Sequence, residues 1–431
     1  MSDFVQQLKA ALDAAPVIDP HTHLRPSRPE ADNLADLVLY HHVWVELVSA
    51  GMPATTTTKA GLPHEVADPG IEPLERVKAA LPYLCHIRGT TCGNLLRTML
   101  EDLYDVPRGE LTEDNVEQVF SLVSGRAADP GWRSHVLRER GHIQKSLTVD
   151  RLDQPACDAS IGWGVEQNLN LVSGKQTPQQ MLAAMEQQTG GSLRRAEDLG
   201  QMMYSLGRGH SQRPIHFVGL WLVPYFGFEE TADSEIAAIL ARAADGRPLG
   251  RDDLSRFSSY AVRYFLQGLR DGPVRTIQLI VGAEVLPPHR SLTHWSPELP
   301  GALGRLAGEF EDFHFNCSSA SDLYTQDLAI LAKHVPNLSV AGYWWHTLYP
   351  FYIRKSIETR LDIVPANKIV AFFSDAYHAE WCYPKLKLVK QILGEVLADR
   401  VARGLLTEEA ALSLPKELLF ENAKRIYGVQ S

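Results

Sequence analysis

The stretch VIDPHTHL, residues 17–24, decides how the rest of this sequence is interpreted. Val17 and Ile18 are typical of a β-strand, and His21 and His23 follow it two positions apart. Side chains at positions i and i+2 of an extended chain point to the same face, so both imidazoles project in one direction. Two neutral imidazoles placed in this way can bind one divalent metal ion. The alternative is a pair of loop histidines that only hydrogen-bond to neighbours. The position after an apolar strand favours the metal site.

The rest of the chain alternates short apolar runs with helical patterns, which is typical of βαβ units and a parallel sheet. Candidate strands are residues 14–19, 143–149, 215–223, 276–282, 313–317, 338–343 and 369–374. Apolar residues at three- and four-residue spacing predict helices within 180–188, 234–244, 327–335 and 385–402. We expect an α/β fold, a (β/α)8 TIM-type barrel, although the sequence leaves the eighth strand unplaced.

The region from about residue 30 to residue 140 is mostly helical in pattern and is too long for one crossover connection. We expect it to be a helical insertion after the first strand that covers the mouth of the barrel. The segment 207–214, GRGHSQRP, is predicted to be a loop. A domain boundary there is not needed, and residues 1–431 are expected to form a single metal-dependent barrel domain.

Composition excludes several classes of protein. The formal net charge of −10 disfavours a nucleic-acid partner, which would require clustered Lys and Arg. The first residues, MSDFVQQLKAALDAAP, predict an amphipathic helix and not a secretory signal, and no apolar run is long enough to span a membrane. The 5 cysteines form no CxxC pair, so we expect free, buried thiols in a reducing compartment. A cytoplasmic protein is expected.

Asp375 is the candidate for a third metal ligand. It follows the last apolar run, IVAFFSD, and the first and last strands of a closed barrel are neighbours. As an anion it would neutralise the cation and could act as a base toward bound water or substrate. The alternative role is that of an N-cap for the helix that follows, which is common for Asp.

Motifs spread along the whole chain resemble those of one family. They are PHTHL (20–24), HHVW (41–44), GYWWH (342–346), SDAY (374–377), CYPK (382–385) and ENAKRIYG (421–428). In this order they resemble the uronate isomerases of the amidohydrolase superfamily. Those enzymes carry His-x-His-Leu, His-Tyr-Lys-Trp-Arg, Gly-Ser-Trp-Trp-Phe-Asn-Asp, Asp-Ser-Arg, Tyr-Pro-Arg and Asn-Asn-Ala-Lys.

The resemblance implies a barrel fold, metal ligation by His21, His23 and Asp375, and an active-site role for His41. Several family residues are replaced, and the substitutes are His42, Val43, Val45, Ala376, Tyr377, Val223, Tyr225 and Ile280. Arginine binds carboxylates through two parallel hydrogen bonds, which an apolar or phenolic side chain cannot reproduce. The metal centre therefore resembles the family more closely than the pocket that would bind a hexuronate.

We expect Asp375 and His41 to be catalytic, and His42, Trp345, His346 and Tyr377 to bind substrate. For His346 a polar contact over packed tryptophans is an equal alternative. His314 and His216 lie on strands and are potential further ligands, but a hydrogen-bonded core histidine is the expected role of each.

The predicted function is a metal-dependent sugar isomerase of the aldose–ketose type, acting on a small-molecule substrate, a sugar or sugar derivative that need not be a standard hexuronate. One divalent ion is expected, zinc first, with manganese or iron as alternatives. A metal-dependent hydrolase or lyase using a metal-activated water, and a catalytically idle binding protein, are the rival interpretations. The sequence leaves the oligomeric state open, a homo-oligomer included.

Overall fold

The structure is a computed structural model, and it describes residues 3–56, 70–149, 152–172, 176–286, 290–343 and 345–430. These residues form two compact units. Unit 1 contains Met1–Gly162, Tyr349–Phe351 and Phe372–Phe420, and unit 2 contains Trp163–Leu348, Tyr352–Ala371 and Glu421–Ser431. The expected single domain stays a prediction.

Unit 1 is built on a small sheet in the strand order β1-β2-β3. The strands are β1 (Val17–Thr22), β2 (Ile143–Thr148) and β3 (Ile161–Trp163), and β1 pairs in parallel with β2. Every residue of β1 is buried, including its polar ones. Polar side chains in such a strand must find partners inside the protein, which is why the site described below begins here.

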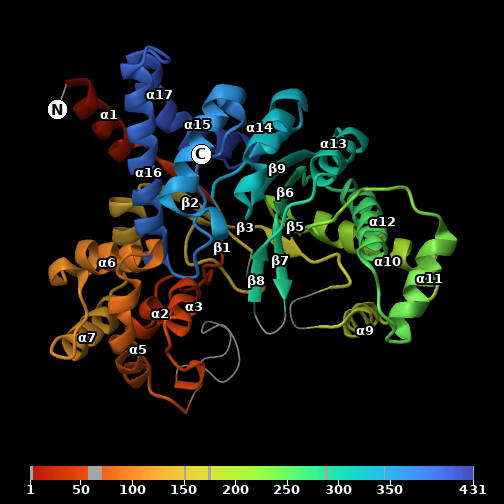
Figure 1. Ribbon diagram of the computed structural model, residues 1–431, viewed down its shortest axis with the longest axis horizontal. Helices are drawn as coiled ribbons and strands as arrows, with labels where there is room; N and C mark the ends of the chain where they lie inside the picture. Colours follow the sequence, from red (N-terminus) through yellow and green to blue (C-terminus); the bar gives the residue numbers. More distant parts are fainter. Residues whose placement is uncertain are drawn as a thin grey trace. The chain divides into compact units, whose positions relative to one another are not determined.

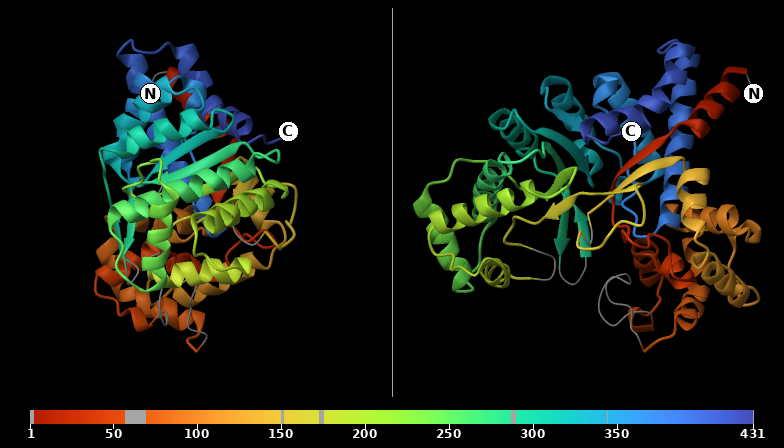
Figure 2. Two further views of the ribbon diagram at one scale, coloured as in Figure 1. Left: turned by 90° about the vertical axis from the view of Figure 1, so that its right-hand side faces the viewer. Right: turned by 180° about the vertical axis from the view of Figure 1, so that it is seen from behind.

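The long connection between β1 and β2 is helical, as predicted. Its elements are α2 (Leu34–Val38), α3 (His41–Ser49), η1 (Ala54–Thr56), α5 (Pro73–Ile87), α6 (Thr91–Tyr104), η2 (Pro107–Gly109), α7 (Val116–Ala127), α8 (Trp132–Ser134) and η3 (His135–Arg140). Unit 1 also holds α1 (Asp3–Ala14), the long α16 (Ala379–Ala402) and α17 (Glu408–Lys416), followed by η7 (Glu417–Glu421). In Figure 1 the connection is the red and orange part of the ribbon, with α16 in blue. Both views of Figure 2 show α1 close to the blue C-terminal helices.

Unit 2 contains a parallel sheet in the strand order β10-β9-β6-β5-β4. Its strands are β4 (Val165–Gln167), β5 (Phe217–Trp221), β6 (Thr276–Val281), β9 (His314–Ser319) and β10 (Leu338–Val340). A hairpin, β7 (Ala283–Leu286) with β8 (Arg290–Thr293), follows β6. Parallel strands connected by helices confirm the α/β class; closure into a barrel stays a prediction.

The helices of unit 2 cover this sheet, and Figure 1 shows α10 and α12 beside each other. The elements are α9 (Pro178–Thr189), α10 (Ala196–Ser211), α11 (Asp233–Ala244), α12 (Arg251–Leu269), α13 (Leu299–Glu309), η4 (Asp322–Tyr324), α14 (Thr325–His334), η5 (Trp345–Thr347), α15 (Pro350–Ile363), η6 (Ala366–Lys368) and α18 (Asn422–Ile426). α15 begins in the part of the chain assigned to unit 1. All four helices predicted from the apolar spacing are present, and their ends differ from the predicted ends by at most six residues.

The predicted loop at 207–214 is wrong for its first half, because α10 continues to Ser211. Gly207 serves helix packing, whereas a Cβ atom at Gly209 would meet no atom within 4 Å. A Cβ atom at Gly207 would lie 2.0 Å from the carbonyl oxygen of Phe265 in α12, and one at Gly268 would lie equally close to the carbonyl oxygen of Tyr204. Only glycine allows the two helices to approach this closely, so the glycine-rich pattern marks a contact and not a turn.

Two strand predictions also need correction. The segment around residues 161–167, which no prediction covered, supplies β3 and β4. Gly164 lies between them, where a Cβ atom would lie 2.2 Å from the Phe217 ring, and the glycines hide the strand pattern. By contrast, the predicted strand 369–374 makes a single parallel bridge, Ile369 with Val340. Further along this segment, the Ser374 amide donates to Asp19 Oδ1 in β1.

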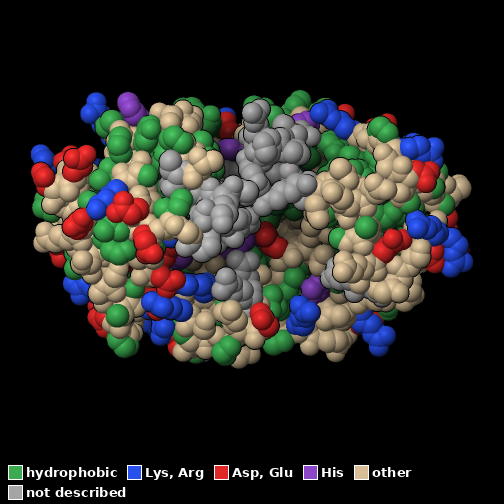
Figure 3. All heavy atoms as spheres, turned by 90° about the horizontal axis from the view of Figure 1, so that it is seen from below, with side chains coloured by type: hydrophobic (Ala, Val, Ile, Leu, Met, Phe, Trp, Pro, Cys, Tyr) green, Lys and Arg blue, Asp and Glu red, His purple; other side chains and the backbone are tan. Residues whose placement is uncertain are grey.

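All five cysteines are free, as predicted, but not all are buried: Cys317 and Cys382 are buried, whereas Cys85 is exposed. Within the described ranges, no helix combines the length and the apolar content that crossing a bilayer requires. Figure 3 shows acidic and basic side chains interspersed over the described atoms of one face.

Candidate metal centre

The end of β1 and the segment after Phe373 are joined backbone to backbone. The Asp375 amide donates to the carbonyl oxygen of His21 at 3.0 Å, and the His23 amide donates to that of Ala376 at 2.8 Å. Asp375 has a φ of 52°, in the left-handed region that Asp tolerates better than most residues. These bonds bring His21 and His23, near the start of the chain, close to Asp375, near its end.

His21, His23 and Asp375 come together there. The Nε2 atoms of His21 and His23 lie 3.5 and 3.4 Å from Asp375 Oδ1, and all three side chains are largely buried. Burial alone would raise the pKa of Asp375, but hydrogen bonds from the two histidines hold it well below its usual range. The cluster therefore offers two imidazole nitrogens and an ionised carboxylate, a ligand set that suits a divalent metal with a position left for water or substrate.

Asp19 adds buried negative charge beside this cluster. Its Oδ1 accepts a hydrogen bond from the Ser374 amide at 2.9 Å, and its side chain is fully buried. In the part of the chain that the structure describes, Oδ2 has no hydrogen-bond partner. Burial raises the pKa of Asp19 to about 6. A buried carboxylate oxygen without a partner is expensive, and a nearby cation would reduce that cost, so Asp19 agrees with a metal at the cluster.

His41 and His42 reach the same carboxylate from the helical insertion. They open α3, and each has a nitrogen in a group with an Asp375 oxygen whose atoms all lie within 4.8 Å of one another. A neutral imidazole offers one nitrogen that donates a hydrogen bond and one that accepts a hydrogen bond or binds a metal ion, so both residues could contribute to this site. The expected neighbourhood of His41 and Asp375 is therefore present.

Tyr377 lies in the same cluster. Its ring stacks on that of His23, with centroids 4.6 Å apart and planes 7° from parallel, and it meets the His41 ring edge-on at 5.0 Å. The phenol is half-buried. It stands where the resembling family has Arg, so this position holds a flat aromatic surface and a hydroxyl instead of a guanidinium.

Lys385 and Tyr40 are part of the site, yet the sequence analysis assigned them no role. The Lys385 Nζ donates to Tyr40 Oη at 2.8 Å and to the Ser374 carbonyl oxygen at 2.7 Å, and Tyr40 Oη donates to the carbonyl oxygen of Asp375 at 3.0 Å. The Lys385 side chain is buried. Together the two residues hold the carbonyl groups of the turn that carries Asp375. Two signals in the sequence pointed to Lys385: it lies in the apolar run WCYPKLKLV, and it ends the CYPK motif that resembles the family's Tyr-Pro-Arg.

The remaining expected residues lie in unit 2. His346 belongs to η5 and is half-buried, and burial lowers its pKa; the Trp345 side chain lies outside the described residues. Their place in a common site stays a prediction.

His314 and His216 are core histidines, as expected. His314 Nε2 lies 2.8 Å from Ser339 Oγ and His216 Nδ1 lies 3.0 Å from the Tyr427 carbonyl oxygen. His314 is the first residue of β9 and His216 precedes β5, so both lie at the amino ends of strands. Active sites of parallel α/β folds lie at the opposite, carboxyl ends.

Comparison with known proteins supports the resemblance. No protein-family model matches the chain. A uronate isomerase from Xanthomonas campestris pv. campestris is 22% identical over 462 residues, which cover 98% of this chain and 95% of that protein. Among solved structures, the uronate isomerase from Thermotoga maritima has a TM-score of 0.82 at 12% identity, covering 99% of this chain and 98% of the other. The glucuronate isomerase from Caulobacter crescentus has a TM-score of 0.79 at 16% identity, covering 99% and 94%. The chain is thus similar to uronate isomerases in sequence over nearly its whole length, and it shares their fold.

Proposed function

We propose that this protein is a metal-dependent sugar isomerase that interconverts an aldose and a ketose. The observation that carries the proposal is the convergence of His21, His23 and Asp375 at the end of β1, in a chain similar throughout to uronate isomerases. A divalent ion held by these three residues, zinc first and manganese or iron as alternatives, would polarise the carbonyl and hydroxyl oxygens of the sugar.

Aldose–ketose isomerisation moves a proton between two adjacent carbons, which requires a base and an acid near the substrate. Asp375 is ionised in this cluster and is the proposed base. His41, in the same group of atoms, is suited to exchange a proton with a sugar oxygen. Tyr40 and Lys385 hold the Asp375 turn in place.

The substrate is a sugar or sugar derivative that is not restricted to the standard hexuronates. His42, Tyr377, Trp345 and His346 are the residues proposed to bind it. Imidazole and phenol groups bind hydroxyl groups well, but they do not replace an arginine as a carboxylate partner.

We also propose a closed barrel and a cytoplasmic location. The fold is a (β/α)8 barrel, and the similarity to a solved uronate isomerase supports this proposal. The enzyme acts in the cytoplasm on a small molecule.

The test is incubation of the metal-loaded protein with a panel of aldoses, ketoses and uronates in heavy water, followed by NMR. Isomerisation by proton transfer predicts that at least one sugar is converted and that deuterium appears at C1 or C2. Asp375→Asn should abolish both signals. His86→Ala, a substitution of an exposed histidine in α5, is the matched control and should retain them.

Absence of conversion and exchange with every sugar of the panel would contradict the proposal for that panel. Hydrolysis of lactones or esters by the same sample, lost in Asp375→Asn, would instead assign the site to the rival hydrolase chemistry. Both measurements use protein whose metal content has been determined.

A further inference from the structure

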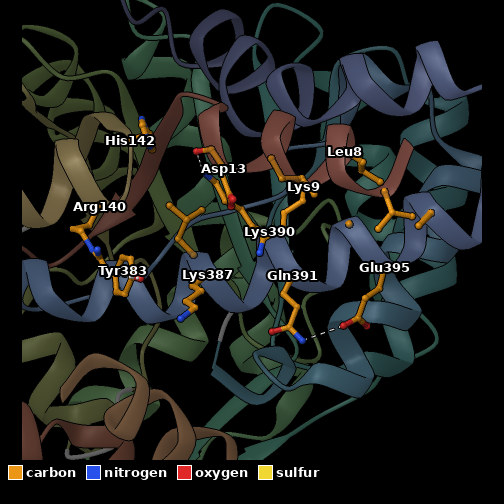
Figure 4. A pocket seen from close by; sticks show the side chains of 15 residues that line it. Leu8, Lys9, Asp13, Arg140, His142, Tyr383, Lys387, Lys390, Gln391 and Glu395 are labelled. Carbon is orange, nitrogen blue, oxygen red and sulfur yellow. Dashed lines mark hydrogen bonds between the residues drawn. The ribbon is translucent and has the colours of Figure 1, made fainter. Parts of the chain in front are cut away.

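A cavity separate from the candidate metal centre lies in unit 1, between α1 and α16. Its volume is about 600 Å³, within the range of about 300–1,000 Å³ typical of small-molecule sites. The two helices approach closely at Gly394, where a Cβ atom would lie 2.7 Å from Leu12 Cδ1. Figure 4 shows the side chains of both helices around the cavity. We call it the α1/α16 groove.

The walls of the groove are apolar along much of their length. Val5, Leu8 and Leu12 contribute from α1, and Leu386 and Ala398 from α16. Such walls favour a ligand with a hydrocarbon or aromatic body, because burying that body removes apolar surface from water.

The charged side chains at the groove are mostly basic. Lys9, Arg140, Lys387 and Lys390 line it against only two acidic residues, Asp13 and Glu395, and His142 adds a further imidazole. Asp102 neutralises Lys387, so the cationic side chains still exceed the carboxylates by one, in a chain whose formal net charge is −10. This local excess favours an anionic ligand.

Lys390 is a half-buried basic group with weak partners. Its Nζ donates to the carbonyl oxygens of Asp13 and Ala15 at the end of α1, both at 3.3 Å, and it forms no ion pair within the described ranges. Burial lowers the pKa of Lys390 to about 8. By contrast, Lys387 pairs with Asp102, and Arg140 donates to Tyr383 Oη and the Asp102 carbonyl oxygen. An anion in the groove would give the Lys390 ammonium the partner that the chain does not supply.

From these observations we infer that the α1/α16 groove binds an organic monocarboxylate with an apolar body, its carboxylate at Lys390 and its body along Leu8, Leu12 and Leu386. The inference is independent of the proposed isomerase activity, since none of these residues belongs to the candidate metal centre. In Figure 4, Lys390 lies between Arg140 and Tyr383 on one side and Gln391 and Glu395 on the other. The carboxylate would therefore meet the basic side of the groove, away from Glu395.

The test is isothermal titration calorimetry on the full-length protein with sodium octanoate as the probe. Two further compounds separate the contributions: octanol has the same body without charge, and acetate has the charge without the body. Octanoate should bind at least tenfold more tightly than either. Lys390→Met should weaken octanoate binding at least tenfold, whereas Lys333→Met, an exposed lysine on α14, should leave it unchanged.

A second variant protects the test against misfolding of Lys390→Met. Ala398→Trp would fill the groove while leaving Lys390 intact, and it should remove octanoate binding. The inference is overturned if octanoate does not bind at millimolar concentration, if octanol or acetate binds as tightly, or if a folded Lys390→Met or Ala398→Trp protein binds octanoate like the wild type.

Discussion

The start and the middle of α16 place ionisable side chains in very different surroundings. At its start, Glu380 and Lys385 are buried and surrounded by hydrogen-bond partners from distant parts of the chain. Further along, Lys390 faces the α1/α16 groove with two carbonyl oxygens at 3.3 Å as its partners. At the start of the helix, hydrogen bonds from Lys385 hold a site together. At Lys390, a ligand could supply the partner that the ammonium group lacks. The difference lies in the partners and not in the residue types.

The largest effect is expected on the metal content of the cluster of His21, His23 and Asp375, which Lys385 at the start of α16 supports. His23→Ala removes one of the three proposed ligands, so we expect bound metal to fall below a tenth of the wild-type content, with the fold retained. Elemental analysis after gel filtration measures the metal, and circular dichroism measures the fold. His86→Ala is the control. Undiminished metal in His23→Ala would show that the ligand set is wrong.

The next effect concerns Lys385 itself. Lys385→Met leaves the Ser374 carbonyl oxygen and the Tyr40 hydroxyl without their buried donor, which should lower the free energy of unfolding by about 3 kcal/mol. Urea unfolding measures it. If Lys385 also positions Asp375, the metal dissociation constant should rise in Lys385→Met and partly recover in Lys385→Arg. A loss of stability with unchanged metal affinity would limit Lys385 to a structural role.

Glu380 tests whether ionisation of a buried carboxyl group at the start of α16 lowers the stability of the fold. Its carboxyl group accepts hydrogen bonds from Trp132 Nε1 at 2.9 Å and from the Ala31 amide at 3.0 Å, yet burial raises its pKa to about 7 from 4.5. The folded state therefore binds the proton more tightly than the unfolded state. The stability from this group is complete below pH 4.5 and is lost as the pH rises to 7.

Accordingly, the free energy of unfolding should fall by roughly 2 kcal/mol more in the wild type than in Glu380→Gln between pH 4.5 and pH 7. Urea unfolding at several pH values checks this difference. Parallel pH profiles for the two proteins would contradict the raised pKa.

The smallest effect is expected at the groove. Lys390→Met loses two long hydrogen bonds but also the cost of burying an ammonium group, so stability at pH 7 should change by less than about 1 kcal/mol. Because the pKa of Lys390 is lowered to about 8 from 10.5, the unfolded state binds more protons in that interval. Wild-type stability should gain from this group as the pH rises from 8 to 10.5, and Lys390→Met should lack the gain. A destabilisation as large as that of Lys385→Met would remove the contrast between the two lysines.

Local patterns in the sequence predicted much of the fold and part of the site. The two-residue period of a strand placed His21 and His23 on one face, and the strand order predicted that Asp375 would join them. The predicted helices are present because their apolar spacing matches the face that they bury. The failures at Gly164 and Gly207 share one cause: a glycine pattern looks the same whether it marks a turn or a close approach by a neighbour.

The sequence by itself determined where the metal-ligand types lie and which elements carry them. Only the tertiary structure decided which charged side chains obtained partners. Lys385 donates to Tyr40 across 345 positions of the chain, whereas Lys390, five residues later on the same helix, donates only to two carbonyl oxygens among the described residues. The local sequence around both lysines is similar, but the partner of a buried charge comes from whichever distant segment packs against it. That packing sets the solvation and the hydrogen bonds of each charge.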